Sequence, residues 1–489
     1  MRQTDEFLDE FFWPNSLAIV GATNNHLKMN FRIVENLVTL KFKGRIYPVN
    51  MHAHNILGIK AFSRLRDIKE TIDVVISAVP ASNTMDIVKE CNSIGVKRLV
   101  IITGGFSEGG DEGKRLSREI ASFVKENNIR TLGPNTLSPI NTGNNLVISF
   151  NPVKKLKSGG LSFAFQSGFY EPKLNWIFAH LGINKMIDMG NKMDINEVDV
   201  LRFFLKDPST KVIAMHIESL HGSGKEFFNL LRSTTRKKPV IILKSGHTNA
   251  GSQAAASHTG SIANENDLIF DSLIRQAGAI RAQNIDQFFD FAKAFEFLPL
   301  PKGNKAAIIM LSGGEGVMAT DSCQLSGLEI AKLNSNTHQK LKQILPPWEI
   351  PLNPFDAGVC MEFHLSELKE FFSSLSSIPK DENVDATIMQ MPPDILYFLS
   401  SNPETSAQTK KYLHDQYITS ILHMRVRGKP FVMWCSTMDE EEMTLVRILE
   451  SSSLPVFQSS ERAINALSAM HTYNRYRSEI INTAKNDYA

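Results

Sequence analysis

The sequence lacks several features that would assign a chain of 489 residues to a class at once. Its four cysteines lie far apart and form no CxxC pair, so neither a zinc site nor a disulfide framework is indicated. No apolar run approaches the roughly 20 residues of a membrane span, and the start "MRQTDEFLDEFFWPNS" lacks the basic and apolar pattern of a signal peptide. A formal net charge of +2 gives no electrostatic case for nucleic acid. We therefore expect a cytoplasmic protein with no metal site and with neither nucleic acid nor membrane as a partner.

A nicotinamide-binding fingerprint is also missing. After the first apolar run, "GATNNHLKMN" contains one glycine and no G-x-G, and no acidic residue closes "RIYPVN" to bind a ribose hydroxyl. A bound nicotinamide cofactor is therefore disfavoured. Two alternatives stay open for this loop, namely a phosphate-bearing ligand held by backbone amides and Thr23, or a sheet edge without a ligand.

What the sequence does contain is a regular alternation of strand-like and helical patterns. The apolar runs "SLAIVGA", "DVVISAVPA" and "RLVIITGGF" predict buried parallel strands, and "TMDIVKECNSIG" predicts a helix between two of them. The same alternation continues along the chain and predicts three doubly wound parallel-sheet α/β domains. We expect these domains at residues 1–151, 152–296 and 304–475, with the linker "FLPLPKGN" before the third and a C-terminal tail at 476–489.

Glycine-containing loops follow several predicted strands. In parallel sheets, ligands bind beyond the carboxyl ends of the strands. "FQSGFY" leads into a helical stretch, so Ser167 and Gly168 are expected at a helix N-terminus, which favours an anion. "SGGEG" has the same form in the third domain, with Gly313 and Gly314 at the helix start. Each loop alone is weak evidence, because glycine loops often only turn the chain.

His258 lies among small residues in "SQAAASHTGSIAN". A core histidine needs bulky neighbours and a metal ligand needs other ligands nearby, whereas a histidine that takes on a large group needs space. A phosphorylated imidazole would be stabilised by the two helix starts. Glu218, at the end of "AMHIES", would fix one ring nitrogen and leave the other free to attack phosphorus. The alternative for Glu218 is a strand-end cap or a surface charge.

In this order, the segments resemble the nucleoside-diphosphate-forming acyl-CoA synthetases of the acetate–CoA ligase (ADP-forming) α-subunit type, which are relatives of succinyl-CoA synthetase. The resemblance extends from "LAIVGAT" to about "LPVFQSS" and is most specific in "MGNKMDINEVDVL" and "KKPVIILKSGHTNAGSQAAASHTGSIA". It implies a Rossmann-like CoA-binding domain followed by two flavodoxin-like domains of the succinyl-CoA synthetase type.

The resemblance also implies roles for individual residues. His258 is expected to be the phosphohistidine and Glu218 the carboxylate that assists it. The residues expected to hold phosphate are Gln166, Ser167, Gly168, Asn191, Gly313 and Gly314. The residues expected to bind CoA are Gly21, Ala22, Thr23, Val49, Asn50, Val79, Pro80, Gly104 and Asn135. The implied reaction interconverts acyl-CoA, phosphate and ADP with the carboxylic acid, CoA and ATP, through an acyl phosphate and a phosphohistidine.

Nucleotide binding in this family belongs to an ATP-grasp domain, and no segment of the sequence remains to form one. The resemblance therefore implies a separate ATP-grasp β subunit that binds ATP or ADP and Mg, in an α2β2 assembly. The sequence departs from the family pattern at Met29, Asn30, Thr136, Ser138, Phe165, Phe169 and Tyr170. These departures are compatible with an enzyme for another acid or with a CoA- or acyl-CoA-binding subunit without turnover. Both alternatives stay open, as do the acyl group and the choice between ADP and GDP.

Overall fold

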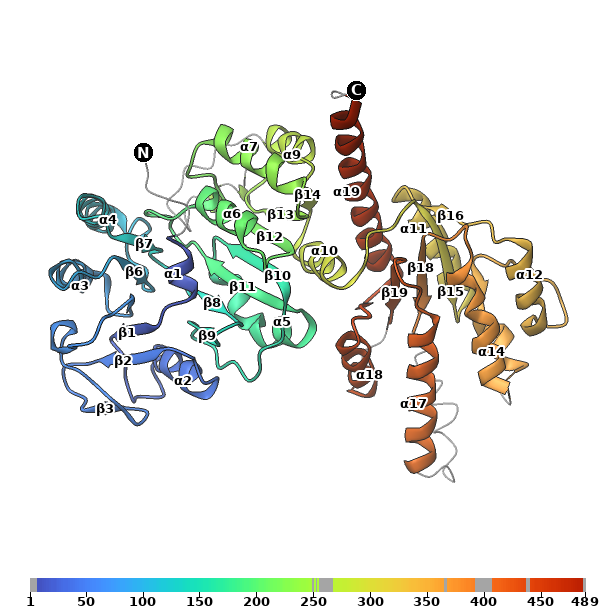
Figure 1. The fold of residues 1–489 in the computed structure, drawn as a ribbon, viewed down its shortest axis with the longest axis horizontal. Coiled ribbons are helices and arrows are strands. Elements are labelled where there is room, and N and C mark those ends of the chain that lie inside the picture. The colour runs from blue at the N-terminus through green and yellow to red at the C-terminus, as the bar shows by residue number, and fades with distance from the viewer. Residues whose placement is uncertain are drawn as a thin grey trace. The chain divides into compact units, whose positions relative to one another are not determined.

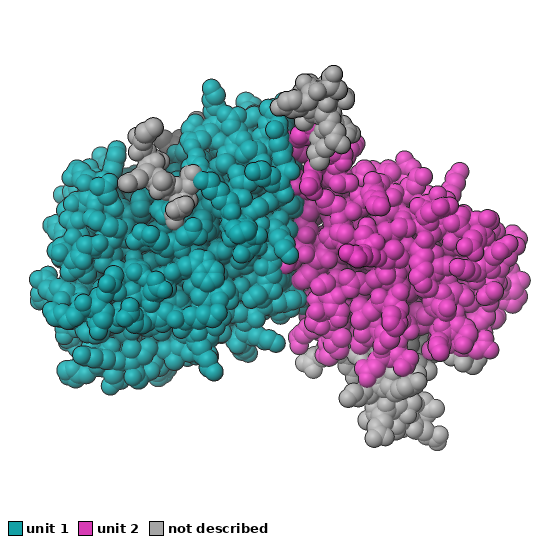
Figure 2. All heavy atoms as spheres, in the orientation of Figure 1, with its two compact units in different colours: residues 1–283 teal, residues 284–489 magenta. Residues whose placement is uncertain are grey.

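The computed structural model describes residues 7–248, 250–251, 253–254, 267–364, 367–391, 407–436 and 440–486. The chain divides into two compact units, Met1–Gln283 (unit 1) and Asn284–Ala489 (unit 2), which Figure 2 shows in two colours. Among the described residues, unit 1 contains two large sheets and the small two-stranded sheet of β3 (Asn55–Ile56) and β4 (Ile59–Lys60), and unit 2 contains one large sheet (Figure 1).

The first sheet of unit 1 is parallel throughout, in the order β2-β1-β5-β6-β7. Its strands are β1 (Ser16–Val20), β2 (Arg45–Val49), β5 (Val74–Ser77), β6 (Arg98–Ile101) and β7 (Arg130–Leu132). Its connections contain α2 (Phe31–Thr39), β3 (Asn55–Ile56), β4 (Ile59–Lys60), η1 (Leu65–Asp67), α3 (Ala81–Ser93) and α4 (Gly110–Glu126). Every residue of β1 is buried, as expected for an apolar strand covered on both faces.

The second sheet of unit 1 has the order β14-β13-β12-β10-β11-β8-β9. Its parallel strands are β10 (Ser158–Phe165), β11 (Ile183–Asp188), β12 (Val212–Ile217), β13 (Val240–Lys244) and β14 (Ile280–Ala282). The short strands β8 (Ile140–Asn141) and β9 (Leu146–Val147) extend it antiparallel at the β11 edge. The helices of this part are η2 (Gly168–Lys173), α5 (Leu174–His180), α6 (Glu197–Lys206), α7 (Gly224–Thr235) and α9 (Asp267–Gln276).

The two sheets of unit 1 share one apolar core, to which β1 and β5 of the first sheet and β10–β12 of the second contribute. Helix α1 (Asp9–Phe12) belongs to this junction, since Phe12 stacks on Phe203 of α6 with ring centroids 5.1 Å apart. The carbonyl oxygen of Phe12 accepts hydrogen bonds from the side-chain amides of Asn141 and Asn144, at 2.8 and 2.9 Å. The N-terminal segment is therefore fastened to the second sheet, although it precedes the first sheet in the chain.

Unit 2 contains a sheet in the order β16-β15-β18-β19-β20, with β17 also paired to β15. Its strands are β15 (Lys305–Met310), β16 (Glu329–Ile330), β17 (Phe355–Asp356), β18 (Ala386–Gln390), β19 (Phe431–Trp434) and β20 (Val456–Phe457). Its helices are α10 (Ile285–Phe297), α11 (Gly313–Leu325), α12 (Ser335–Leu341), η3 (Lys342–Ile344), α13 (Ala357–Glu362), α14 (Leu368–Leu375), α15 (Ser377–Lys380), α17 (Ala407–Met424), α18 (Glu440–Ser451) and α19 (Ser460–Asn486).

The expected α/β architecture with three parallel sheets is confirmed. In both large sheets of unit 1 the first parallel strand lies between the second and the third, and in unit 2 β15 lies between β16 and β18. Three segments make contacts across the expected domain boundaries, which themselves stay predictions. Residues 140–147, expected in the first domain, pair with the second sheet, and α10, expected in the second domain, packs against α19 in unit 2. Residues 476–486, expected to form a tail, continue α19.

Candidate active site

Unit 1 contains a cavity of about 420 Å³ at the carboxyl ends of strands from both of its sheets. It is lined by Ile102, Asn135, Thr136, Leu137, Phe150, Gln166, Ser167, Gly168, Phe169, Asp188 and Asn191. Ile102 and Asn135 follow β6 and β7 of the first sheet, whereas Gln166 and Asp188 come from the ends of β10 and β11. The cavity thus lies where ligands bind in parallel α/β sheets. It brings together one residue expected to bind CoA, Asn135, and four expected to hold phosphate.

The loop after β10 forms one wall of the cavity. Ser167 caps η2 in an extended conformation, and a Cβ added at Gly168 would meet no atom within 4 Å, so the backbone borders open space. The side-chain oxygen of Gln166 accepts hydrogen bonds from the backbone N–H groups of Glu218 and Ser219, at 2.8 and 3.2 Å. Gln166 therefore joins the ends of β10 and β12. The expected helix start is a six-residue 3₁₀ turn that is followed by α5.

Of the two residues expected to act in phosphoryl transfer, the structure describes Glu218 but not His258. Glu218 is 6% exposed, and its carbonyl oxygen accepts a hydrogen bond from Lys244 Nζ at 2.8 Å. His258 and most of the small residues around it lie outside the described residues. Their approach to Glu218 therefore stays a prediction.

Asn135 and Asn191 link the two sheets at the cavity. Asn135 has a left-handed φ of 60°, and the backbone N–H of Asn191 donates to the Pro134 carbonyl at 2.9 Å. The side-chain amide of Asn191 donates to Glu108 at 2.6 Å, and Glu108 in turn accepts from the Gly105 N–H at 2.8 Å. Side-chain hydrogen bonds thus connect the loop after β6 with the loop after β11.

The other residues expected to bind CoA gather along the carboxyl edge of the first sheet and are not cavity-lining residues. Gly21 has a φ of 88°, and a Cβ there would collide with the Ala78 carbonyl, so the loop after β1 needs glycine. The side-chain amide of Asn50 donates to the Ala22 carbonyl at 2.8 Å. The remaining members are Val49, which is the last residue of β2, and Thr23, Val79, Pro80 and Gly104, which lie in the loops after β1, β5 and β6. At the departure Asn30, the side-chain amide donates to the Gly21 carbonyl at 2.5 Å.

Gly313 and Gly314 begin α11 in unit 2, as expected for a helix start. The structure places them beside a carboxylate that the sequence analysis did not consider. Glu315 accepts hydrogen bonds from Gln390 Nε2, Trp434 Nε1 and Ser436 Oγ, at 2.8, 2.9 and 3.0 Å. This helix start therefore has an acidic side chain of its own, which opposes a second anion nearby.

Asp188 is the site residue that sequence reasoning missed. It is the last residue of β11, is 1% exposed, and accepts hydrogen bonds from the N–H groups of Gly190 and Leu137, at 3.0 and 3.3 Å. The pKa of Asp188 is raised to about 7, first by burial and then by the nearby carboxylates Glu171 and Glu218, against the pull of these two N–H groups. A sequence signal existed, since an acidic residue directly follows the apolar pair Met186 and Ile187 at the end of a strand.

Several departures from the family pattern surround Asp188. Thr136 and Ser138 both donate their hydroxyl hydrogens to the Asp188 carbonyl, at 2.5 and 3.1 Å. Tyr170 stacks on Phe165 with centroids 4.2 Å apart, and its hydroxyl donates to the Leu137 carbonyl at 2.5 Å. Thr136 and Ser138 thus hold the backbone of Asp188, and Tyr170 holds Leu137, whose N–H group contacts the Asp188 carboxylate.

Within the described ranges, no group of three or more His, Cys, Asp or Glu side chains has the arrangement of a metal site. The helices in those ranges include none that combines the length and the apolar composition of a membrane span.

Comparison with known proteins assigns both parts of unit 1. A family model described as a CoA binding domain matches residues 15–141, and one described as a succinyl-CoA ligase like flavodoxin domain matches residues 158–295. Together these matches show a CoA-binding domain followed by a flavodoxin-like domain of the succinyl-CoA ligase type, a domain pair of the CoA ligase class.

Relatives whose names state an activity narrow the class of protein. The chain is 33% identical over 474 residues to an ADP-forming acetate–CoA ligase II of Archaeoglobus fulgidus, covering 96% of this chain and 67% of that protein. It is 30% identical to the ADP-forming acetate–CoA ligase I subunit alpha of Pyrococcus furiosus, covering 96% of this chain and 99% of that subunit. The structure of the dinucleotide-forming acetyl-coenzyme A synthetase 1 of Ca. Korarchaeum cryptofilum, in complex with phosphate and ADP, matches with a TM-score of 0.82 and 28% identity, over 97% of this chain and 98% of that one. The chain belongs to the family of the ADP-forming acetate–CoA ligases, which confirms the resemblance inferred from the sequence.

Proposed function

We propose that the chain is the α-type part of an ADP-forming acyl-CoA synthetase. The observation that carries this proposal is the cavity where the strand ends of the CoA-binding domain meet the loop Gln166–Gly168 of the flavodoxin domain. A thioester bound along the first sheet would there meet a phosphate held by the backbone of Ser167 and Gly168.

The steps then follow from the chain's own residues. Phosphate attacks the acyl-CoA thioester in the cavity, which gives an acyl phosphate and free CoA. The acyl phosphate transfers its phosphoryl group to His258, while Glu218 fixes the tautomer of the imidazole. The phosphohistidine then phosphorylates ADP, and every step runs in both directions because both intermediates retain a high transfer potential.

We propose that ATP or ADP and Mg bind to an ATP-grasp β partner. The almost complete match to a relative named as an α subunit supports a separate partner. The longer relative, of which this chain covers 67%, supports a nucleotide-binding part joined to the same chain in some members. If the β partner is a separate chain, we propose an α2β2 assembly. The mass of the complex in solution tests this assembly.

The test is transfer of label from phosphate to protein. The purified chain is mixed with ³²P-phosphate and acetyl-CoA, butyryl-CoA, benzoyl-CoA or succinyl-CoA. We expect an acid-labile, base-stable label on the protein from one donor, and its loss in His258→Ala. Label that persists in His258→Ala would contradict the assignment of the phosphohistidine.

A second candidate is a CoA- or acyl-CoA-binding subunit without turnover. Glu315 favours it, because a carboxylate beside Gly313 and Gly314 opposes binding of a phosphoryl group at this helix start. This candidate predicts CoA binding in calorimetry without any label from the four donors, even when a β partner is present.

A further inference from the structure

Formation of an acyl phosphate from a thioester requires a proton to change places. The attacking oxygen of HPO₄²⁻ forms the new C–O bond, and the electron pair of the breaking C–S bond goes to the CoA sulfur. The phosphate hydroxyl proton must leave, and the CoA thiolate must gain one, since thiols have a pKa of about 8.5. A group that accepts the first proton and donates it to the sulfur balances the step without a further reactant.

Asp188 is placed for this task by the geometry of the cavity. Among the described residues that line the cavity, it is the only one whose side chain ionises near neutral pH. The cavity joins the predicted CoA edge, through Asn135, to the predicted phosphate loop, through Ser167 and Gly168. A carboxyl group on this wall can therefore reach both the incoming phosphate and the departing sulfur.

The carboxyl group is held in a fixed orientation. Gly190 donates to Oδ1 at 3.0 Å and Leu137 to Oδ2 at 3.3 Å, and each oxygen keeps a further lone pair. Thr136 and Ser138 hold the backbone carbonyl of the same residue. Such positioning of an acid–base group limits the reorganisation that proton transfer requires.

The electrostatic surroundings suit a group that exchanges its proton. The pKa of Asp188 is raised to about 7, first by burial and then by Glu171 of η2 and Glu218 after β12. Tyr170 stays a neutral phenol, because burial first, and then the charges of Asp188 and Glu171, raise the pKa of Tyr170 well above its usual value. Lys192, in the adjoining loop, contacts Glu197 at 2.8 Å and the Ser219 carbonyl at 2.5 Å. General acid–base catalysis is most effective when the pKa of the group lies near the working pH.

We propose that Asp188 takes the proton from the attacking phosphate and delivers it to the CoA sulfur as the thioester is cleaved. This inference rests on the proposed function and adds an acid–base residue to its first step. It predicts that only the step from acyl-CoA to acyl phosphate depends on Asp188.

The test compares two donors of label in the full chain. Wild type and Asp188→Asn receive either acyl-CoA with ³²P-phosphate or acetyl ³²P-phosphate, which enters after the proton transfer. We expect Asp188→Asn to lose about 100-fold or more of the labelling rate from acyl-CoA, the usual contribution of an acid–base group. The rate from acetyl phosphate should stay within about threefold of wild type, because that donor bypasses the missing group. The pH profile of the acyl-CoA reaction should lose its inflection near 7.

Glu171→Gln is the matched control, because Glu171 is a buried carboxylate with a pKa raised by burial that is held by Ser149 and Asn151 and does not line the cavity. It should keep both labelling reactions, with the inflection of the acyl-CoA reaction at a lower pH, because Glu171 contributes to the raised pKa of Asp188. An Asp188→Asn protein that keeps its labelling rate from acyl-CoA would overturn the inference. Loss of label from both donors would also overturn it, since Asp188 would then only shape the phosphate site. A wild-type chain that takes label from neither donor would overturn the proposed function itself.

Discussion

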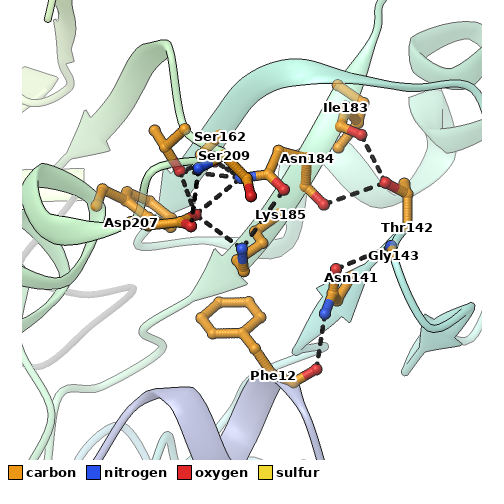
Figure 3. Close-up of polar contacts among 12 residues, drawn as sticks. Phe12, Asn141, Thr142, Gly143, Ser162, Ile183, Asn184, Lys185, Asp207 and Ser209 are labelled. Atoms are coloured by element: carbon orange, nitrogen blue, oxygen red, sulfur yellow. Dashed lines mark hydrogen bonds and ion pairs between the residues drawn. The ribbon is translucent and has the colours of Figure 1, made fainter. Parts of the chain in front are cut away.

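The two ends of strand β11 use buried charge in opposite ways. At its start, Lys185 forms an ion pair with Asp207 at 2.7 Å, and Asn184 and Thr210 donate to the same carboxylate oxygen at 2.9 and 2.6 Å. Figure 3 shows this cluster, with the ring of Phe12 beside the lysine, whose Nζ lies 6.0 Å from the ring centroid. At its end, the carboxylate of Asp188 borders a cavity and contacts two backbone N–H groups and, among the described residues, no cation.

The difference shows where stability and chemistry reside in one strand. Removing one partner of a buried, hydrogen-bonded ion pair lowers the free energy of unfolding by several kcal/mol, because the other charge is left buried and unpaired. A buried carboxylate without a cation instead destabilises the folded state when it ionises. Five predictions test this contrast and the loops beside the cavity, from the largest expected effect to the smallest.

Lys185→Ala should have the largest effect. It leaves Asp207 buried without its cation, so the free energy of unfolding of unit 1 should fall by about 3–5 kcal/mol in urea titrations. Arg115→Ala is the control, because Arg115 and Glu119 are exposed and 3.8 Å apart, and it should cost less than about 0.5 kcal/mol. If both variants lost the same free energy of unfolding, the buried ion pair at the start of β11 would not have the stabilising role described here.

Asp188→Asn should change how stability depends on pH. A carboxyl group whose pKa rises from 3.8 to about 7 on folding costs stability as the pH rises through this range. The variant should remove this loss, which amounts to about 4 kcal/mol between pH 4 and pH 8. Unfolding free energies of both proteins across this pH range measure the effect.

Asp207→Asn should change the pH dependence of stability in the opposite direction. Burial would raise the pKa of Asp207, but hydrogen bonds from Lys185 and Thr210 bring it below its usual value. The stability from Asp207 is therefore present at neutral pH and is lost as the pH falls through the folded pKa. The difference in unfolding free energy between variant and wild type should change with pH in opposite directions for Asp188→Asn and Asp207→Asn. A change in the same direction for both variants would refute the comparison.

Gly168→Ala should affect ligand binding at the cavity rather than folding. The added methyl group enters open space and should raise the KM for phosphate about tenfold, since it occupies room that the anion needs. The unfolding midpoint should stay unchanged. Gly190→Ala is the contrasting variant, because φ is +54° and its Cβ would collide with the Pro134 carbonyl, so it should destabilise unit 1. A stable Gly190→Ala protein would contradict this account of the loop.

Tyr170→Phe should have the smallest effect. It removes the hydrogen bond to the Leu137 carbonyl and should cost about 1 kcal/mol of stability, with the pH profile of labelling unchanged. Tyr47→Phe is the control, because the buried Tyr47 hydroxyl has no hydrogen-bond partner among the described residues. Its removal should be neutral or stabilising, and a cost equal to that of Tyr170→Phe would argue against the role of the Leu137 contact.

The sequence was sufficient to predict the long parallel strands, because the buried runs "SLAIV" and "VIILK" are apolar except at one terminal residue, Ser16 and Lys244 respectively. It did not predict the pairing of β8 and β9, since two-residue strands carry no periodic pattern. Helix α10 was assigned to the preceding domain by its place in the chain, whereas its buried faces and the Asp290–Arg462 contact at 2.6 Å belong to unit 2. Tertiary contacts of this kind are not encoded in local spacing.

The candidate site was predictable only where its residues carry a local sequence pattern. Glycine and hydroxyl loops at strand ends identified Gln166, Ser167 and Gly168, all of which line the cavity. Asp188 was missed because the perturbation of its pKa arises from burial and from carboxylates far away in sequence. Glu315 was missed because its three hydrogen-bond donors come from β18, β19 and the loop beyond.

The attachment of Phe12 to Asn141 and Asn144 bears on how genes of this kind can be divided. A break near codon 151 would separate α1 from the sheet that it covers, and each product would expose half of a shared core. A break near codon 284 would leave each product with a core of its own. Fission and fusion of coding sequences should therefore be tolerated at the second position and selected against at the first.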